Sequence, residues 1–458
     1  MSRVDRTRLP TPGPSTPFKF PTIHRRALSN GLDVRIVVQR NVPVVSAVLL
    51  LPGGTAADPA DRPGLAAFTA DLLDEGCAGR SAIEVSDLLA RYGADFDVDV
   101  GPDAIAVSVM TMTRYMKPAL TLLAEMATAP NLAESDIERV RKLRLERLRQ
   151  LRDHAPAVAE RAFVRMLYRD HPYGHLGLGS ESALEATSQM DIVRFHRGAF
   201  VPSGSTIVIA GDASLDELLD VVADTFGAWE TPADATPINR LAGLAPPPLV
   251  PEHRLAVVPR AGAAQSELRI GHVCASRETP DYHAMVLLNT ILGGQFVSRV
   301  NMNLRQDKGY TYGVRTGFDL RRGLGPFVLQ TSVGTEVTAP AIREALKEID
   351  DIRGQRPATE EELALARASV TLGYPRGFET AQQVARGVSS LALHNLPDTY
   401  FEEFVPRIEA VTLDTIARVA GQYLDPSRMV TLVVGDHGRV ASELTTLNLG
   451  EPMVLSAS

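Results

Sequence analysis

Two histidines, His171 and His175, have the four-residue spacing that places metal ligands on one face of a helix. Pro172 and Gly174 lie between them, so a stable helical turn is not expected. We expect a turn in which His171 caps or packs. The chain contains no H-x-x-E-H or H-E-x-x-H zinc motif and no G-x-S-x-G nucleophile elbow. The sequence therefore offers no metal site or nucleophile of a common type.

Arg305 and Tyr312 form a second chemically capable pair, seven residues apart in the segment LRQDKGYTYGV. Arginine presents a permanent, planar fork of donors to a peptide carbonyl or a terminal carboxylate. A tyrosine hydroxyl can donate a hydrogen bond to an oxyanion that develops during peptide hydrolysis. For an isolated pair at this spacing, a packed tyrosine and a surface arginine at a helix end is the better interpretation.

Composition excludes several classes of protein. The chain has 458 residues and a formal net charge of −8, which argues against nucleic acid as the main partner. No apolar run approaches the roughly 18 residues that span a bilayer. Cys77 and Cys274 are too few for a disulfide framework. With no apolar signal segment at the N-terminus, we expect a cytoplasmic protein, or a periplasmic one if a leader was removed.

An internal duplication organises the chain. Residues 191–212 and 415–436 share a helical pattern, a proline, and a β-branched run that ends in Gly-Asp. The offset is 224 residues, since 436 − 212 = 224. Two predicted capping boxes, Ser135-x-x-Glu138 and Thr359-x-x-Glu362, keep the same offset. The first predicted strands of the two halves, 34–40 and 255–260, are approximately equivalent. The chain is therefore predicted to consist of two similar halves.

Each half contains strands and helices in an order that predicts an α+β fold rather than strict βαβ alternation. Six prolines mark a linker between the halves. The predicted strands include 44–51, 104–112 and 205–211, and the predicted helices include 65–76, 83–93 and 135–153. The predicted domain boundaries are a flexible arm (1–21), an N-terminal domain (22–230), a Pro-rich linker (231–252) and a C-terminal domain (253–450).

Four phrases carry a resemblance to a known family over roughly residues 22–450: LSNGLDVRIVVQ (28–39), RPGLAAFTADLLDEG (62–76), HPYGHLGLGS (171–180) and ILGGQFVSRVNMNLRQDKGYTYGV (291–314). The sequence resembles the pitrilysin/insulinase metallopeptidases, in their mitochondrial-processing-peptidase-like branch. The resemblance implies two homologous α/β-sandwich domains of the LuxS/mitochondrial processing peptidase type. Such a pair forms one half of a clamshell that closes around a peptide.

The zinc motif of this family is missing. Active members carry H-x-x-E-H on the helix after Pro-Gly-Leu, where two imidazoles bind zinc and the glutamate activates water. Here the two ligand positions hold Ala67 and Asp71, and the base position holds Ala70. Glu146 is the candidate for the family's third ligand, although an ordinary helix carboxylate is the better interpretation. We therefore expect no metal and no cofactor in this chain.

By the same resemblance, Arg305 and Tyr312 correspond to the pair that grips the substrate near the scissile bond. Within the phrase ILGGQFVSRVNMNLRQDKGYTYGV, substrate binding by Arg305 and Tyr312 is therefore a better interpretation than packing. Gly293 and Gly294 correspond to a glycine-rich stretch that helps to capture substrate, and a simple turn is the alternative. The basic segment 139–152 predicts an amphipathic helix, either a solvated face or a wall of the peptide chamber.

Three functions remain open. The first is the non-catalytic, substrate-gripping subunit of a heterodimeric zinc metalloendopeptidase, inactive alone and completed by a zinc-bearing H-x-x-E-H paralogue. The second is a structural scaffold that keeps the peptidase fold without proteolysis. The third is a stand-alone hydrolase with another nucleophile, and no motif in the sequence supports it. The Arg305–Tyr312 pair favours the first function.

Overall fold

Two six-stranded mixed sheets form the framework, one in each half of the chain. The structure is a computed structural model that describes residues 18–233, 235–236, 238 and 245–456. In spatial order the first sheet consists of β1 (Ile23–Ala27), β2 (Asp33–Val38), β6 (Thr206–Gly211), β3 (Val44–Pro52), β5 (Ala104–Met112) and β4 (Asp95–Val100). The second consists of β12 (Met453–Val454), β7 (Leu255–Pro259), β11 (Val430–Gly435), β8 (Gln265–Ala275), β10 (Gly325–Gly334) and β9 (Val314–Phe318).

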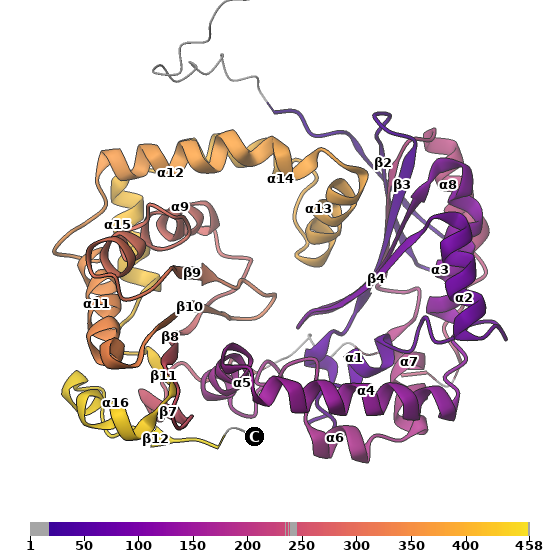
Figure 1. The fold of residues 1–458 in the computed structure, drawn as a ribbon. Helices are drawn as coiled ribbons and strands as arrows, with labels where there is room; N and C mark the ends of the chain where they lie inside the picture. Colours follow the sequence, from indigo (N-terminus) through magenta and orange to yellow (C-terminus); the bar gives the residue numbers. More distant parts are fainter. Residues whose placement is uncertain (1–17, 234, 237, 239–244, 457–458) are drawn as a thin grey trace, which may run out of the picture.

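Five strands of each sheet repeat one topology, which confirms the predicted duplication. In each sheet a parallel pair, β2 with β6 or β7 with β11, adjoins an antiparallel run of strands. The sixth strand differs, since β1 is antiparallel to β2 and β12 is parallel to β7. β6 and β11 differ by 224 residues, since 430 − 206 = 224. The predicted α+β class is confirmed. Both sheets leave one strand, β4 or β9, at an edge next to the centre of the molecule (Figure 1).

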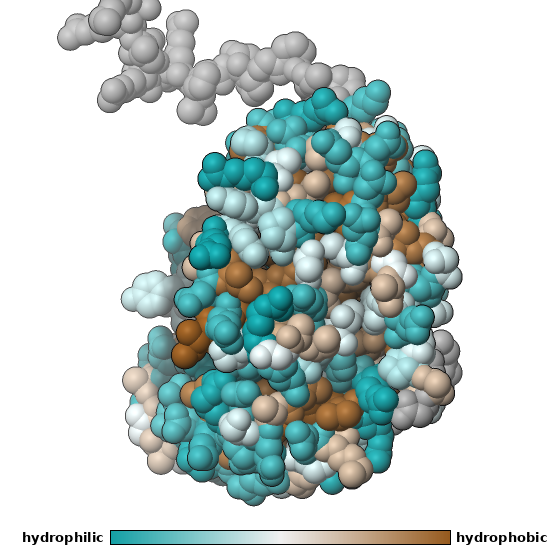
Figure 2. Space-filling view, turned by 90° about the vertical axis from the view of Figure 1, so that its right-hand side faces the viewer, coloured by the Kyte–Doolittle hydropathy of each residue, from teal (hydrophilic) through white to brown (hydrophobic). Residues whose placement is uncertain are grey.

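Each sheet buries one face under helices of its own half. The helical elements of the first half are η1 (Thr55–Ala57), α1 (Leu65–Ala70), α2 (Ala82–Tyr92), η2 (Thr113–Tyr115), α3 (Met116–Thr128), α4 (Glu134–Arg152), α5 (Ala155–Tyr168), α6 (Glu181–Ala186), α7 (Gln189–Ala199) and α8 (Leu215–Phe226). Those of the second half are α9 (Tyr282–Leu292), α10 (Arg299–Asn301), η3 (Met302–Asp307), η4 (Thr335–Val337), α11 (Thr338–Asp351), α12 (Glu360–Gly373), η5 (Tyr374–Phe378), α13 (Ala381–Leu393), α14 (Tyr400–Glu409), α15 (Leu413–Tyr423), α16 (His437–Leu444) and η6 (Thr445–Leu447). α2, α3 and α8 form an outer surface on which hydrophilic and hydrophobic side chains are interspersed (Figure 2).

The other face of each sheet is covered by a helix from the opposite half. α13 lies on β3 and β6 of the first sheet, whereas α5 lies on β8 and β11 of the second (Figure 1). Alternation along the strands makes this possible: Ile207 and Ile209 face the helices of the first half, while Val208 packs in the same cluster as α13. This exchange of helices joins the two halves through their cores.

Two predicted helix boundaries were wrong. The predicted helix 65–76 ends at Ala70. Residues 71–75 form tighter turns, in which the amides of Leu72, Leu73 and Glu75 donate to the carbonyl three residues back. The Ser135 capping box is absent: α4 begins at Glu134, and the N-cap residue, Ala133, makes no side-chain cap. The corresponding box at Thr359 is present.

The described end of the N-terminal arm is packed. Residues 1–17 of the predicted arm lie outside the described part, as do positions 234, 237 and 239–244 of the predicted linker. Phe18 and Phe20 contact aromatic rings of the second half, while β1 extends the first sheet. Among the described residues, no helix is long and apolar enough to cross a bilayer.

Candidate functional site

The segment that would carry the zinc motif is a short, deeply packed helix. α1 contains six residues, and Ala67 and Ala70 are 8% and 1% exposed. Asp58 caps its N-terminus by accepting hydrogen bonds from the backbone amides of Gly64 (2.6 Å) and Ala66 (2.7 Å). The Cβ of Ala67 lies so close to the loop 176–179 that a methyl group on Gly177 would approach it to 3.3 Å. Little space for a larger side chain remains on this face.

Arg144 of α4 binds the one carboxylate left in the motif. Its guanidinium forms an ion pair with Asp71 and donates a hydrogen bond to the carbonyl of Gly177 at 2.6 Å. The Arg144 side chain is almost completely buried. Glu146, the candidate third ligand, is exposed. The sequence analysis missed Arg144, and its position 73 residues after Asp71 on the amphipathic α4 is the only signal that could have indicated it.

Beside this ion pair lies a cavity of about 480 Å³, lined by Ala70, Asp71, Asp74, Glu75, Phe96, Asp97, Val98, Val140, Leu143, Arg144, Arg147 and Leu178. α1, α4 and the edge strand β4 supply its walls. Desolvation and the nearby charges of Glu75 and Asp71 raise the pKa of Asp74 above its ordinary value. The cavity is thus lined by apolar and charged side chains in equal number, and it includes Ala70 and Asp71 of the altered motif.

These residues do not fit a zinc ion. A zinc site needs three or four protein ligands, usually imidazole, thiolate or carboxylate. Ala67 and Ala70 supply none, and the Asp71 carboxylate is already paired with Arg144. Within the described ranges, no group of three or more His, Cys, Asp or Glu side chains is arranged to hold a metal.

His171 and His175 stabilise loops rather than converging on a common ligand. His171 Nδ1 accepts a hydrogen bond from the Tyr173 amide (3.1 Å), and its Nε2 lies 3.0 Å from the Ala245 carbonyl. His175 Nε2 is 2.9 Å from Asp58, the residue that caps α1. This confirms the expected turn, in which His171 packs.

The basic helix is largely a structural element. The seven basic residues of 139–152 include Arg141, which is buried and donates to the carbonyls of Leu184 and Thr187, and Arg139, which pairs with Glu75. Only Arg144 and Arg147 among them line the cavity beside α1. The helix therefore contributes one wall of that cavity, and most of its charge is used within the protein.

Arg305 lies on a π-helical turn, η3. Its wider winding is shown by the amide of Lys308, which donates to the carbonyl of Asn303 at 3.0 Å, five residues back. Short π-helical segments occur frequently at functional sites. The guanidinium carbon of Arg305 lies 3.9 Å from the centre of the Phe296 ring. Arg305 forms no hydrogen bond or ion pair with any residue in the part of the chain that the structure describes.

Tyr312 is 94% exposed, in the irregular segment that precedes β9. Tyr310, two residues earlier, packs against the core of the second half and anchors this segment. The alternative of a packed tyrosine therefore applies to Tyr310 and not to Tyr312. The hydroxyl of Tyr312 is presented to the solvent from an anchored segment.

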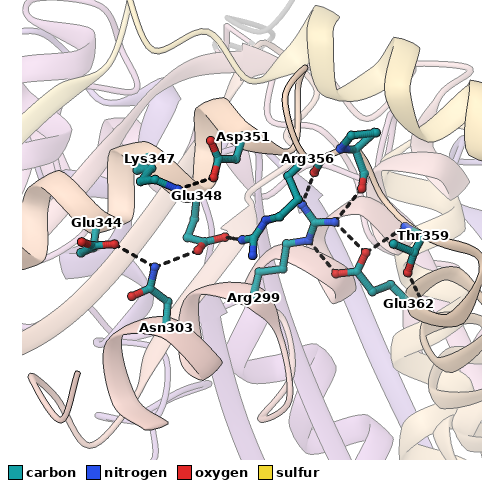
Figure 3. Close-up of polar contacts among 10 residues, drawn as sticks. Arg299, Asn303, Glu344, Lys347, Glu348, Asp351, Arg356, Thr359 and Glu362 are labelled. Atoms are coloured by element: carbon teal, nitrogen blue, oxygen red, sulfur yellow. Dashed lines mark hydrogen bonds and ion pairs between the residues drawn. The ribbon is translucent and has the colours of Figure 1, made fainter. Parts of the chain in front are cut away.

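A network of partly buried polar contacts connects the π-helical turn and α10 to α11 and α12 (Figure 3). Arg299, in α10 just before the turn, donates twice to the Glu362 carboxylate at 2.6 Å. Asn303 donates to Glu344 (3.0 Å) and to Glu348 (2.8 Å) on α11. Burial alone would raise the pKa of Glu362, but hydrogen bonds from Arg299 and Thr359 lower it below its ordinary value. The turn is thus fixed to α11 and α12.

Gly293 and Gly294 end α9 and allow close packing. A methyl group on Gly293 would lie 2.5 Å from the Thr316 side chain of β9, and one on Gly294 would lie 2.7 Å from the Asn289 amide. Gly293 is buried and Gly294 is exposed. Packing alone accounts for Gly293, and a role of either glycine in substrate binding stays a prediction.

The chain is similar to peptidases over most of its length. Residues 35–179 match a family model described as Insulinase (Peptidase family M16), and residues 188–370 match one described as Peptidase M16 inactive domain. An uncharacterized zinc protease of Mycobacterium tuberculosis is 24% identical over 432 residues, which cover 94% of this chain and 97% of that protein. A probable mitochondrial-processing peptidase subunit beta of Schizosaccharomyces pombe is 21% identical over 453 residues, covering 93% and 95%.

Solved structures share the fold. The crystal structure of a peptidase M16 inactive domain from Pseudomonas fluorescens superposes with a TM-score of 0.84 at 23% identity, covering 90% of this chain and 98% of that one. The predicted pair of homologous domains is thereby confirmed. The two model matches together span most of the chain, and they show that it belongs to the M16 (insulinase) peptidase family, as a member whose zinc-motif positions hold Ala67, Ala70 and Asp71.

Proposed function

We propose that this chain is the non-catalytic, substrate-gripping subunit of a heterodimeric zinc metalloendopeptidase. The partner is a paralogue that carries H-x-x-E-H and supplies the zinc. One observation carries the proposal: the polar groups of Arg305 and Tyr312 have no protein partner among the described residues. They keep this availability in a chain whose zinc-motif helix has alanine at a ligand position and at the base position. A side chain that is held in place but unpaired is suited to an external ligand.

The two residues would perform different tasks. The guanidinium of Arg305 would hold the oxygen atoms of the bound peptide through its fork of N–H donors. The hydroxyl of Tyr312 would donate to the oxygen that becomes negative when the scissile carbonyl is attacked. No residue of this chain activates the attacking water, because the base position is Ala70. The chain therefore depends on its partner for the chemical step.

Membership of a two-subunit enzyme is supported by the similarity to a protein named as a processing-peptidase subunit. Co-expression with an H-x-x-E-H paralogue from the same genome tests the proposal directly. We expect a stable equimolar complex by size-exclusion chromatography with light scattering, and zinc-dependent cleavage of a quenched-fluorescent peptide by that complex. Cleavage by the isolated chain that resists chelators would contradict the proposal.

The scaffold function is the alternative, and the same experiment separates it. A scaffold would also form a complex with its partner, but the partner would then be fully active alone. Substitutions of Arg305 and Tyr312 would leave the rate of cleavage unchanged. Those results would favour the scaffold function over substrate binding.

A further inference from the structure

Arg305 differs from the other buried and half-buried arginines of this chain. Arg299 and Arg144 are saturated by carboxylates and backbone carbonyls. Arg305 is half-buried, yet within the described ranges its contact is the face of the Phe296 ring, at 3.9 Å. Its five N–H donors therefore remain available while its orientation is restrained. A guanidinium in this state is prepared for a ligand that offers acceptor oxygens.

Phe296 is largely exposed and belongs to no hydrophobic core cluster among the described residues. Its side chain is 65% exposed, and it makes no contact with another aromatic ring among the described residues. An exposed phenylalanine gains little from burial. The ring over a cation, in contrast, is a recognised attractive arrangement. The contact with Arg305 is therefore the clearest interaction of the Phe296 ring among the described residues.

The backbone next to Phe296 is fixed to the same elements that hold Arg305. Asn301 donates to the Gln295 carbonyl at 3.2 Å, so the residue before Phe296 is tied to α10. Asn301 also donates to the Val314 carbonyl (2.8 Å) and accepts from the Val314 amide (2.9 Å), which links the start of η3 to β9. Phe296, the π-helical turn and the segment after Tyr312 therefore form one connected unit.

We propose that Phe296 is a positioning residue that holds the Arg305 guanidinium, so that its N–H fork is presented to the oxygen atoms of a bound peptide. This inference rests on the proposed function, because it assigns a peptide as the ligand of Arg305. The ring restrains a flexible side chain before binding, which reduces the conformational entropy that binding would otherwise cost. Phe296 itself need not touch the peptide.

The first test uses the isolated full-length chain and needs no ligand. The Nε–Hε signal of Arg305, assigned by its loss in Arg305→Lys, should be displaced upfield by the ring current of Phe296. We expect the Phe296→Leu variant to lose this displacement and Phe296→Tyr, which keeps a ring, to retain it. An Arg305 signal that is identical in the wild type and in Phe296→Leu would overturn the inference.

The second test measures binding of fluorescein-labelled oxidised insulin B chain by fluorescence anisotropy. It uses the heterodimer in which the partner's general-base glutamate is replaced by glutamine. Phe296→Leu should raise Kd about 2- to 5-fold, in line with an exposed cation–π contact. Phe296→Tyr and the neighbouring control Val297→Ala should bind as the wild type does. In an Arg305→Ala background, Phe296→Leu should have no further effect.

The two possible failures are distinguishable. If Phe296→Leu weakens binding equally with and without Arg305, Phe296 acts on the peptide by itself, and the positioning role is wrong. If Arg305→Ala leaves Kd unchanged, or if no heterodimer forms, the proposed function fails, whereas the resonance of Arg305 still decides whether Phe296 holds the guanidinium.

Discussion

At the scale of single residues, the molecule combines zinc-motif positions that cannot bind a metal with an arginine and a tyrosine whose polar groups are unpaired among the described residues. Ala67, Ala70 and the Asp71–Arg144 ion pair occupy the zinc-motif region, while Arg305 and Tyr312 are left without partners among the described residues. The absence of the motif and the presence of the pair were predictable from the letters alone. Arg144 and Phe296 were not, because their contacts join residues 73 and nine positions apart in the sequence (144 − 71 and 305 − 296).

Tyr312→Phe in the heterodimer should lower kcat by on the order of 10²–10³ and leave KM nearly unchanged. A donor that acts mainly on the transition state affects the rate and not the affinity for substrate. Arg305→Ala should in addition raise KM, since it removes contacts to the bound peptide, and Arg305→Lys should restore only part of the loss. Steady-state kinetics on a quenched-fluorescent peptide provide the measurement. If Arg305→Ala and Tyr312→Phe both cleave the peptide at the wild-type rate, the two residues are structural.

Reinstalling the zinc motif should fail to create a zinc site. In the triple variant Ala67→His, Ala70→Glu, Asp71→His, the first imidazole meets the loop at Gly177, and a carboxylate is buried at a position that is 1% exposed. Arg144 also loses its carboxylate partner and becomes a buried, unpaired cation. We expect less than stoichiometric zinc after dialysis and a lower Tm than that of the parent chain. One tightly held zinc per chain would refute this reasoning.

Stability should fall when the pH is lowered from about 6.5 towards 4. Burial lowers the pKa of His196 from 6.5 to about 4, despite its hydrogen bond with the Ala127 carbonyl. Between these values the unfolded chain binds a proton that the folded chain does not, so the stabilisation present above pH 6.5 is lost as the pH falls. The loss amounts to up to roughly 3 kcal/mol for this residue. Urea unfolding across this range should show a shallower pH dependence in His196→Gln, and an unchanged dependence would rule out His196 as its source.

At the scale of elements, α5 and α13 each cover the sheet of the opposite half and so join the two cores. The sequence analysis found the strands and the 224-residue repeat, because apolar runs and Gly-Asp ends are local patterns. It could not find which helix covers which sheet, because α5 and α13 are amphipathic helices like their neighbours. The early end of α1 was missed for a related reason: the apolar pattern continues to residue 76, although the backbone after Ala70 forms tighter turns.

Phe163→Ala in α5 should destabilise both halves together. Phe163 belongs to the first half and packs in one cluster with strands of the second sheet, where it is almost fully buried. Loss of a buried phenylalanine costs about 3–5 kcal/mol. We expect a single unfolding transition at a lower urea concentration, whereas the control Ile83→Ala, at an exposed site on α2, should unfold like the wild type. Two separate transitions would show that the halves are not coupled through α5.

At the scale of the whole molecule, the two halves of the chain form one connected body. Its halves are joined by the exchanged helices, by Phe18 and Phe20, and by Tyr173, whose hydroxyl accepts a hydrogen bond from the Gly323 amide at 3.0 Å. Closure around a peptide is therefore expected between two subunits rather than within this chain. The duplication could be read from the sequence, but the strength of this coupling could not.

The most direct measurement of the central claim is a titration of the zinc-bearing paralogue with this chain, followed by the rate of peptide cleavage. The account predicts negligible cleavage by either protein alone, a rise to a plateau at equimolar chains, and a plateau lowered on the order of 10²–10³ when the titrant is Tyr312→Phe. A paralogue that cleaves at the full rate before any of this chain is added would contradict the claim. So would a Tyr312→Phe plateau equal to that of the wild type.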